Sequence, residues 1–541
     1  MSNMLRGTML LSGASFLSRF LGMIFVIPFF AIVGTTGNAL FAYAYTPYSI
    51  FISLSTVGIP LAVSKFVSKY NALGDYKAGM RMFRAGGLLM LATGFIAFLV
   101  LFLSADWIGA QQIKGDNGAI SPEDIAFVIR MVSFALIIIP GMSIVRGFFQ
   151  GHQSMGPTAL SQIVEQIVRI GAILIGSYVI VHYFNGSITL AVGFAAFAAL
   201  IGALASCVIL LWYWKKRKSF IYKQIDAQQT SHDFHTIELF KELLQYAGPF
   251  VLVGLAVPLY QFVDQFTFQP AMVASGRATL WETEFAVINN LGHKIIIIPM
   301  TVATGLSMAM LPSLTDAFTQ NDSVSYKKLL NQALQVIMVL VIPASAGIAM
   351  LSDEIFGSLF TLENIEVTGP LMAWYAPVAL LFGLITVTSG MLQGINQQNY
   401  AVISLISGLL VKILVNSQLI HLFGGKGAIL STALAAGIAV FLNLFRLRTS
   451  VQFSFKQTIK RTILTLIFTG MMCIVIAVLK FVFGFFLPYQ TERWATLIML
   501  LIGISSGGLF YLFLAYKSTL LDHIFNGKVP GLSKLQTKKW M

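Results

Sequence analysis

The 541-residue chain is 57% hydrophobic and only 10% charged, and its mean hydropathy is +0.81. Soluble domains carry about 25% charged residues, so this composition excludes an ordinary soluble enzyme and indicates a membrane protein. The formal net charge is +14. Because the basic residues are scattered over several short segments between apolar runs, a nucleic-acid-binding surface is disfavoured and no nucleic-acid partner is expected.

Apolar runs follow one another along the whole chain. We predict about fourteen transmembrane helices and an all-α polytopic fold, because a helix of about 20 residues crosses a hydrocarbon core of roughly 30 Å. The first run is too long for a signal peptide and lacks a small-residue cleavage site, so we interpret it as a span. The predicted spans lie near residues 8–33, 42–64, 84–104, 125–149, 158–183, 188–214, 243–268, 285–311, 328–351, 367–392, 399–422, 426–446, 460–487 and 492–516.

Basic residues gather in alternate connections between these spans. They follow the second, sixth and twelfth spans and continue in the C-terminal tail, whereas the connections near 106–124 and 353–366 are acidic. Positively charged loops stay on the cytoplasmic side of a membrane. We therefore predict that both termini are cytoplasmic, which requires an even number of spans.

The chain contains an internal repeat. The sequence Phe-Phe-Gln-Gly at 148–151 recurs as Met-Leu-Gln-Gly at 391–394, and each copy leads to a basic residue in the next apolar run, Arg169 and Lys412. The intervals 393 − 150 and 412 − 169 are both 243 residues. Duplicated halves are typical of transporters whose site lies between them. We predict a first six-span lobe (1–214), a cytoplasmic linker (215–242), a second six-span lobe (243–448), and two further spans with a basic tail (449–541).

Two cations inside spans have no acidic residue at helical spacing, Arg19 in the first span and Lys294 in the eighth. An ionisable side chain at the bilayer centre costs at least about 2.5–3.5 kcal/mol, so it faces a bundle interior or a water-filled cavity. We predict that both contact an anionic substrate in a central cavity. Small residues around Arg19 form a face on which another helix can pack closely: Gly13, Ser15, Ser18 and Gly22.

Structural explanations are favoured for the other embedded charges. Glu165 and Arg169 are four residues apart on one helix and are expected to pair. Lys412 in the eleventh span can pair with Asp264 in the seventh, and a contact with substrate is the open alternative. Two further cations lie near cytoplasmic ends of spans, where long side chains reach the membrane surface: Arg84 and Arg146.

Helix breakers inside the spans predict kinks. Pro28 in the first span corresponds to Pro258 in the seventh, and Pro140 and Pro299 interrupt the fourth and the eighth. Proline removes one backbone hydrogen bond and clashes with the preceding turn. Kinks of this kind favour a protein whose helices bend during transport.

Two motifs resemble those of the MurJ-type lipid II flippase family. Ser-Arg-Phe-Leu-Gly at 18–22 is similar to that family's Ser-Arg-x-Leu-Gly signature. Lys294, Pro299 and Leu-Pro-Ser-Leu at 311–314 resemble its Arg-x4-Pro and Leu-Pro-Ser-Leu segment. With the span number and the repeat, the resemblance covers nearly the whole chain. It points to the Gram-positive branch, beside the stage V sporulation protein B group, in the multidrug/oligosaccharidyl-lipid/polysaccharide superfamily.

The resemblance implies an alternating-access flippase rather than an enzyme, with no catalytic residue and no cofactor. The expected substrate is an undecaprenyl-diphosphate-linked cell-wall precursor, lipid II, moved across the bacterial cytoplasmic membrane for peptidoglycan synthesis. Arg19 and Lys294 fall on family positions that contact the headgroup or diphosphate, and the last two spans would form a groove for the lipid tail. The expected partners are this lipid-linked oligosaccharide, membrane lipids and cell-wall synthesis proteins, with a monomeric chain. Gram-negative members carry a second arginine where this chain has Phe25.

Some members of this family hold a sodium ion in the second lobe. Asp264, Asn416 and Thr432 could supply ligands of that kind here, but Lys412, one turn before Asn416, places an ammonium where the ion would sit. We hypothesise that Lys412 replaces the cation as the partner of Asp264. The chain has no Gly-x4-Gly-Lys-Ser/Thr nucleotide-binding loop, so the membrane potential or a cation gradient is left as the driving force.

Three alternatives stay open. The first is a flippase for another lipid-linked glycan, such as a teichoic acid, capsule or spore polysaccharide. The second is a cation-coupled multidrug exporter of the same superfamily, which would need a membrane-embedded acid in the first lobe. The third is a membrane-embedded glycosyltransferase or polymerase, which would need paired carboxylates on a sizeable loop, and the acidic loops here are short.

Overall fold

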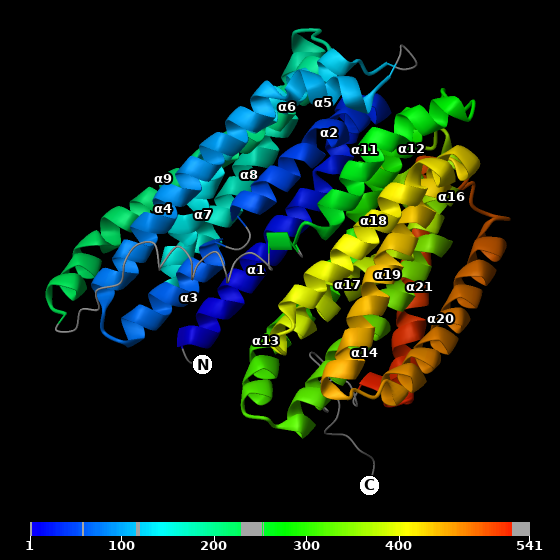
Figure 1. Cartoon of the computed structure of the whole chain (residues 1–541). Coiled ribbons are helices and arrows are strands. Elements are labelled where there is room, and N and C mark those ends of the chain that lie inside the picture. Colours follow the sequence, from blue (N-terminus) through cyan, green and yellow to red (C-terminus); the bar gives the residue numbers. More distant parts are fainter. Residues whose placement is uncertain (1–2, 57–58, 115–118, 229–250, 253, 522–541) are drawn as a thin grey trace. The chain divides into compact units, whose positions relative to one another are not determined.

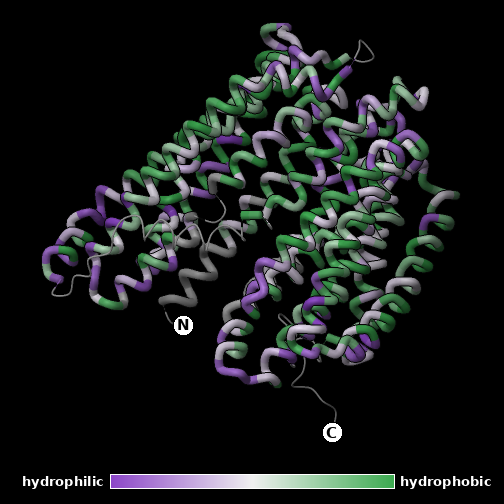
Figure 2. Tube along the Cα trace, in the orientation of Figure 1, coloured by the Kyte–Doolittle hydropathy of each residue, from purple (hydrophilic) through white to green (hydrophobic). Residues whose placement is uncertain are grey.

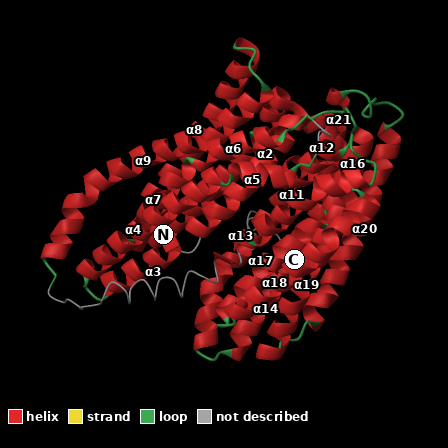
Figure 3. Ribbon diagram, turned by 45° about the horizontal axis from the view of Figure 1, so that its top comes forward, coloured by secondary structure: helices red, strands yellow, loops and turns green. Residues whose placement is uncertain are grey.

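The computed structural model describes residues 3–56, 59–114, 119–228, 251–252 and 254–521, and every regular element among them is a helix (Figures 1 and 3). The chain divides into two compact units, residues 1–286 and 287–541. Within the described residues, eleven helical segments are long and apolar enough to cross a membrane. One of them, Gly13–Leu54, overlaps both of the first two predicted spans. The prediction of an all-α polytopic membrane protein is confirmed.

Unit 1 contains eleven described α-helices and one short π-helical segment, η1 (Val179–Tyr183). Most α-helices are hydrophobic along their middle and hydrophilic near their ends, as at the C-terminal end of α9 (Figure 2). The α-helices are α1 (Asn3–Ile24), α2 (Val26–Thr56), α3 (Ile59–Ala72), α4 (Tyr76–Leu103), α5 (Ala105–Gln112), α6 (Pro122–Ser133), α7 (Ala135–Gly151), α8 (Gly156–Tyr178), α9 (Ile188–Asp226), α11 (Ala256–Ala274) and α12 (Trp281–Ala286).

Unit 2 begins with a π-helical segment, η2 (Val287–Leu291), and continues as α-helices. These are α13 (Gly292–Thr319), α14 (Ser323–Met350), α15 (Ser352–Leu359), α16 (Ile365–Tyr375), α17 (Val378–Gly394), α18 (Gln398–Phe423), α19 (Gly425–Val451), α20 (Lys456–Phe483) and α21 (Arg493–Lys517).

Two of the predicted proline interruptions coincide with helix breaks. The helix stops at Phe25, three residues before Pro28, and again at Leu255, three residues before Pro258. Proline has no N–H for the carbonyl four residues earlier, so the preceding turn loosens. The helix between Pro122 and Gly151 is broken at Phe134, six residues before Pro140, and Pro140 itself lies inside α7. By contrast, α13 continues through Pro299.

The connection predicted between the first two spans, at 34–41, is a single kink inside α2. Gly34 has φ 66° and ψ −165°, and the helical segments on either side of it continue without a loop. A residue with a Cβ rarely adopts this combination of angles, whereas glycine does so at little cost. Gly34 therefore separates the first two membrane crossings.

The seventh predicted span lies in unit 1, although the repeat places it at the start of the second lobe. Buried glutamines on α11 explain this position. Gln265 donates from Nε2 to the carbonyl oxygens of Ala42 and Tyr43 at 3.0 and 2.9 Å, and it accepts a hydrogen bond of 3.0 Å from Gln112. Gln269 exchanges two hydrogen bonds with the backbone of Lys114. Buried amides with satisfied partners fix α11 against α2 and α5.

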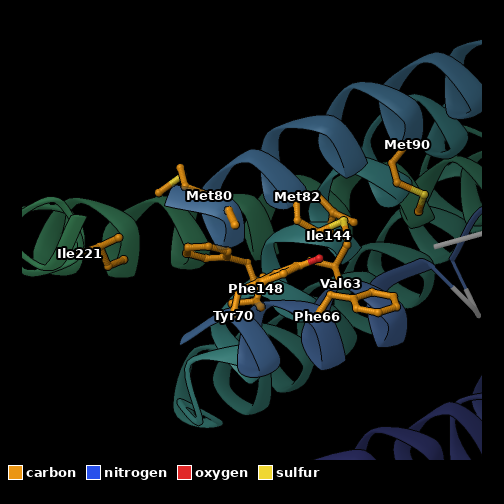
Figure 4. Close-up of a cluster of buried hydrophobic side chains, with 11 residues drawn as sticks. Val63, Phe66, Tyr70, Met80, Met82, Met90, Ile144, Phe148 and Ile221 are labelled. Carbon is orange, nitrogen blue, oxygen red and sulfur yellow. The ribbon is translucent and has the colours of Figure 1, made fainter. Parts of the chain in front are cut away.

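Helix α9 extends through residues 215–226, where the sequence predicted the start of a linker. The rest of that linker, 229–242, lies outside the described residues. Ile221 on this extension packs into a buried apolar cluster with side chains of α3, α4 and α7 (Figure 4). The extension is therefore part of unit 1. The cluster comprises Val63, Phe66, Val67, Tyr70, Ala78, Met80, Met82, Met90, Ile144, Phe148 and Ile221.

His152, which follows α7 and lies outside the apolar span, gives unit 1 a pH-dependent stability. Burial, and secondarily the charge of Arg217, lower the pKa of His152 to about 4. Asn71 donates from Nδ2 to the unprotonated Nδ1 at 3.2 Å. In the unfolded chain the His152 side chain has its ordinary pKa near 6.5, so it binds a proton there before the folded protein does. The stability that neutral His152 provides is therefore lost as the pH falls from about 6.5 towards 4, by at most about 1.4 kcal/mol per pH unit.

We expect the melting temperature to fall between pH 7 and pH 5, and His152→Gln to flatten that fall. The amide of glutamine can accept from Asn71 but does not titrate in this range. Thermal melts of both proteins at the two pH values measure the difference. Equal slopes for the two proteins would contradict this role of His152.

Helices α18 and α19 meet so closely that only glycine fits at one position. A Cβ on Gly427 would lie 1.9 Å from the carbonyl oxygen of Leu419. We expect Gly427→Ala to lower stability by about 1–3 kcal/mol through overpacking. The control is Gly437→Ala in the same helix, where a Cβ meets nothing within 4 Å, and it should raise stability by about 0.5–1 kcal/mol. Melting temperatures that move in the same direction would refute the close contact.

The last two helices are attached to unit 2 by polar contacts, and apolar faces of both are exposed. Lys480 on α20 pairs with the buried carboxylate of Glu354 at 2.8 Å, and the hydroxyl of Tyr511 on α21 donates to the Val339 carbonyl at 2.8 Å. Exposed apolar side chains along α20 and α21 are the surface that contacts lipid in a membrane protein. They include Ile463, Ile467, Ile474, Val478, Leu501, Ile504 and Leu512.

Candidate functional site

An arginine and a glutamate form an ion pair between α7 and α8 in unit 1. The Nη2 of Arg146 lies 2.6 Å from Oε2 of Glu165, and their side chains are only 16% and 17% exposed. Arg146 also donates to the hydroxyls of Ser161 at 3.0 Å and Ser206 at 2.8 Å. Three helices, α7, α8 and α9, therefore meet at one guanidinium.

This arrangement corrects two predictions. Glu165 pairs with Arg146 on the neighbouring helix instead of Arg169 on its own. Arg146 does not reach the membrane surface, because its guanidinium N–H groups bind Glu165, Ser161 and Ser206 inside unit 1. Arg84, by contrast, is exposed on α4, as expected for a cation near a membrane surface.

Arg169 lies one turn beyond Glu165 on α8 and contacts an aromatic residue of α2. Its Nη2 donates to the hydroxyl of Tyr45 at 3.0 Å, and its guanidinium carbon lies 5.5 Å from the centre of the Tyr45 ring. Tyr45 is stacked on Phe41 at 5.1 Å between ring centres. The cation is half-buried and is held by Tyr45, a neutral residue that no sequence motif singles out.

The small-residue face predicted on α1 packs against α8. Ser15 donates to the side-chain oxygen of Gln162 at 3.2 Å, and Ser18 to the backbone oxygen of the same residue at 3.4 Å. A Cβ on Gly22 would lie 3.0 Å from Nε2 of Gln166. The predicted close approach at these three positions is confirmed, whereas Gly13 has open space. Arg19 belongs to α1, but its side chain lies outside the described residues.

In unit 2, a fully buried ammonium lies between α18 and α19. Lys412 is 0% exposed, and its Nζ donates to Oγ1 of Thr432 at 2.6 Å and to Oγ of Ser431 at 3.4 Å. The Ser431 hydroxyl donates in turn to Oδ1 of Asn416. Lys412, Asn416 and Thr432, which the family resemblance grouped around a cation position, thus lie together, and Ser431 is an addition.

Two further predicted residues lie on other helices. Asp264 is buried in α11 of unit 1, so its proposed pairing with Lys412 of unit 2 stays a prediction. Lys294 is half-buried in the first turn of α13, directly after η2. Its neighbour His293 is 2.8 Å from the hydroxyl of Tyr375. Among the residues that the structure describes, no group of three His, Cys, Asp or Glu side chains could hold a metal ion.

Comparison with known proteins identifies the family. A family model described as "Polysaccharide biosynthesis protein" matches residues 4–318, more than half of the chain, and one described as "MatE" matches residues 288–418. The chain is 41% identical to Lipid II flippase MurJ of Bacillus subtilis (strain 168) over 533 residues, which cover 98% of both proteins. The chain belongs to the MurJ family of lipid II flippases.

Two further similarities agree with this assignment. Stage V sporulation protein B of the same organism is 24% identical over 75% of this chain and 76% of that protein. A solved structure of a lipid II flippase MurJ in an inward closed conformation has a TM-score of 0.65 at 18% identity, covering 96% of this chain and all of the other. That likeness concerns the fold. The MurJ-family resemblance predicted from two short motifs is confirmed.

Proposed function

We propose that this MurJ-family protein is an alternating-access flippase that moves lipid II, an undecaprenyl-diphosphate-linked precursor, from the inner to the outer leaflet for peptidoglycan synthesis. The observation that carries the proposal is the 41% identity with the Bacillus subtilis lipid II flippase over 98% of both proteins. The aligned region spans both units and the last two helices.

The chemistry of the embedded charges supports an anionic substrate. A diphosphate cannot cross hydrocarbon without compensation for its lost hydration, and guanidinium and ammonium groups supply that compensation. Arg19 and Lys294 are the proposed contacts to the headgroup or diphosphate. The exposed apolar faces of α20 and α21 provide a surface for the lipid tail.

The direction of transport follows from charge. With both termini on the cytoplasmic side, as the basic loops predict, an inside-negative potential of 100 mV is worth about 2.3 kcal/mol per elementary charge moved across the membrane. This potential favours outward movement of an anion and inward return of an empty cationic site. We propose that the potential, or a cation gradient, drives a monomeric protein, which passes its substrate to cell-wall synthesis proteins outside.

A depletion experiment tests this function. In cells in which this chain is the sole flippase, its depletion should cause lipid II to accumulate in the inner leaflet while other lipid-linked glycans keep their distribution. Lipid extraction with leaflet-selective labelling measures both quantities. Accumulation of a teichoic acid, capsule or spore precursor in place of lipid II would assign the chain to another glycan.

The MatE match over residues 288–418 makes a cation-coupled multidrug exporter the second candidate. An exporter of this kind needs a membrane-embedded acid that can bind a cationic drug. Glu165 in unit 1 is already paired with Arg146. Efflux of a cationic dye that stops in Glu165→Gln, with normal lipid II distribution, would favour the exporter.

A further inference from the structure

We propose that Arg169, positioned by Tyr45, is a substrate-binding residue of unit 1 that contacts the diphosphate of the lipid-linked substrate. This inference rests on the proposed function and adds a binding residue to it. Neither the expected pairing of Arg169 with Glu165 nor the family resemblance assigns Arg169 this role.

The charge of the α7–α8 cluster is the first reason. Two guanidiniums, those of Arg146 and Arg169, accompany one carboxylate, that of Glu165. The carboxylate forms its 2.6 Å ion pair with Arg146, so the cluster carries a surplus of one positive charge. An embedded positive charge is costly, and a fold that needed only packing would be served by an uncharged side chain. The surplus charge suits an anionic ligand.

The contacts of Arg169 are the second reason. Among the described residues, Tyr45 is the hydrogen-bond acceptor of this guanidinium, and it is neutral. Arginine carries five N–H donors, and two parallel donors match a phosphate group. The Tyr45 ring, 5.5 Å from the guanidinium carbon and stacked on Phe41, limits the positions the side chain can adopt. A pre-positioned guanidinium binds an anion with less loss of entropy.

The position of Arg169 on α8 is the third reason. Gln162, Gln166 and Arg169 are spaced four and three residues apart and so share one face of the helix. The first two contact α1 at Ser18 and Gly22, the first and last residues of the motif that contains Arg19. Arg169 lies seven residues, about 10 Å, further along α8 than Gln162. The helix that carries Arg19 and the face that carries Arg169 are therefore packed together.

A binding experiment on the purified full chain tests the proposal. Native mass spectrometry would measure the affinities of undecaprenyl diphosphate and of undecaprenol, which has the same chain without phosphate. We expect Arg169→Gln to weaken binding of the diphosphate at least about tenfold, or about 1.4 kcal/mol, and to leave undecaprenol unchanged. Arg169→Lys keeps the charge but loses the two parallel donors, so it should weaken diphosphate binding about threefold.

Arg446 in unit 2 supplies a matched control. It is also half-buried, lies 5.1 Å from the ring of Tyr400, and donates to the side-chain oxygen of Gln397 at 2.7 Å. Arg446→Gln removes an arginine with the same kind of contacts, so it should change the affinity for the diphosphate by less than about twofold.

Two results would overturn the proposal: unchanged diphosphate binding by a folded Arg169→Gln protein, or equal losses for both lipids, which indicate a structural tie between α8 and α2. If Arg169→Gln does not fold, Arg169→Lys decides, because a structural tie leaves the ratio of the two affinities unchanged. A wild-type protein that does not prefer the diphosphate to undecaprenol would instead contradict the proposed function.

Discussion

Arg146→Met should lower the free energy of unfolding by about 3 kcal/mol, whereas Arg146→Met combined with Glu165→Leu should recover most of that loss. The single change leaves a carboxylate, 17% exposed, without its ion pair, and it removes the donor to Ser161 and Ser206. An unpaired buried charge costs more than a well-packed apolar replacement of both partners.

The internal repeat gives a reason to expect the double variant to fold. At the repeat interval of 243 residues, Arg146 corresponds to Ser389 and Glu165 to Gly408. In unit 2 the equivalent helices pack without this ion pair, since Asn443 on α19 donates to the hydroxyls of Thr388 and Ser389 at 3.0 and 3.2 Å. Neutral groups therefore join the two helices of unit 2, α17 and α19, that correspond to α7 and α9.

Melting temperatures of the two single variants and the double variant measure the coupling between Arg146 and Glu165. Ser206→Ala is the control, because it removes one hydrogen bond and no charge, and should cost about 1 kcal/mol. A double variant that is less stable than either single variant would show that the ion pair is required for folding. Losses no larger than that of Ser206→Ala would show that water compensates the carboxylate.

Much of the fold could be predicted from the sequence, because each segment that crosses the bilayer must be an apolar helix of about 20 residues. Apolar length locates the spans, and proline locates breaks such as those before Pro28 and Pro258, since both effects act within one helix. The glycine and serine face of α1 is also local, and its packing against α8 followed from residue size.

The partner of Glu165 could not be obtained from helical spacing alone. Spacing selects Arg169, four residues away, but the short connection between α7 and α8 brings a second arginine closer. Arg146 lies five residues before Gly151, the end of α7, and Ser161 five residues after Gly156, the start of α8. Residues at equal distances from a helical turn lie opposite each other, so counting from the turn places Arg146 opposite Ser161. Glu165 lies one turn beyond Ser161 on α8, within reach of the long arginine side chain.

The place of α11 in unit 1 has a different origin. The repeat gives the order of corresponding segments along the chain. The boundary of a compact unit depends instead on which buried side chains form hydrogen bonds with each other's helices. Gln265 and Gln269 are polar residues within an apolar segment, and their carbonyl partners lie on α2 and beside α5. Residue spacing does not show which backbone carbonyl will accept a hydrogen bond from a buried glutamine. The lobe boundary predicted from the repeat therefore differs from the division into compact units.

Lys412→Ala should make the stability of the protein depend on sodium, which the wild-type protein should not show. Removal of the buried ammonium leaves a cavity lined by the oxygens of Thr432, Ser431 and Asn416. Hydroxyl and amide oxygens are the ligands that hard cations prefer. We therefore expect Lys412→Ala to melt several degrees below wild type in choline chloride and to recover part of that loss in sodium chloride. Sodium at ten times its dissociation constant would restore about 1.4 kcal/mol.

Lys412→Met separates the loss of charge from the loss of volume. Methionine is unbranched and fills most of the space of the lysine side chain, so no room is left for an ion between α18 and α19. It should be destabilised to the same extent in both salts. Thermal melts of wild type, Lys412→Ala and Lys412→Met in sodium and choline chloride make the comparison. Identical melting of Lys412→Ala in the two salts, or a sodium-dependent wild type, would mean that Lys412 does not take the place of a cation. The expected pattern would instead assign the lysine the role of a covalently attached cation, so that this flippase needs no sodium ion at this position.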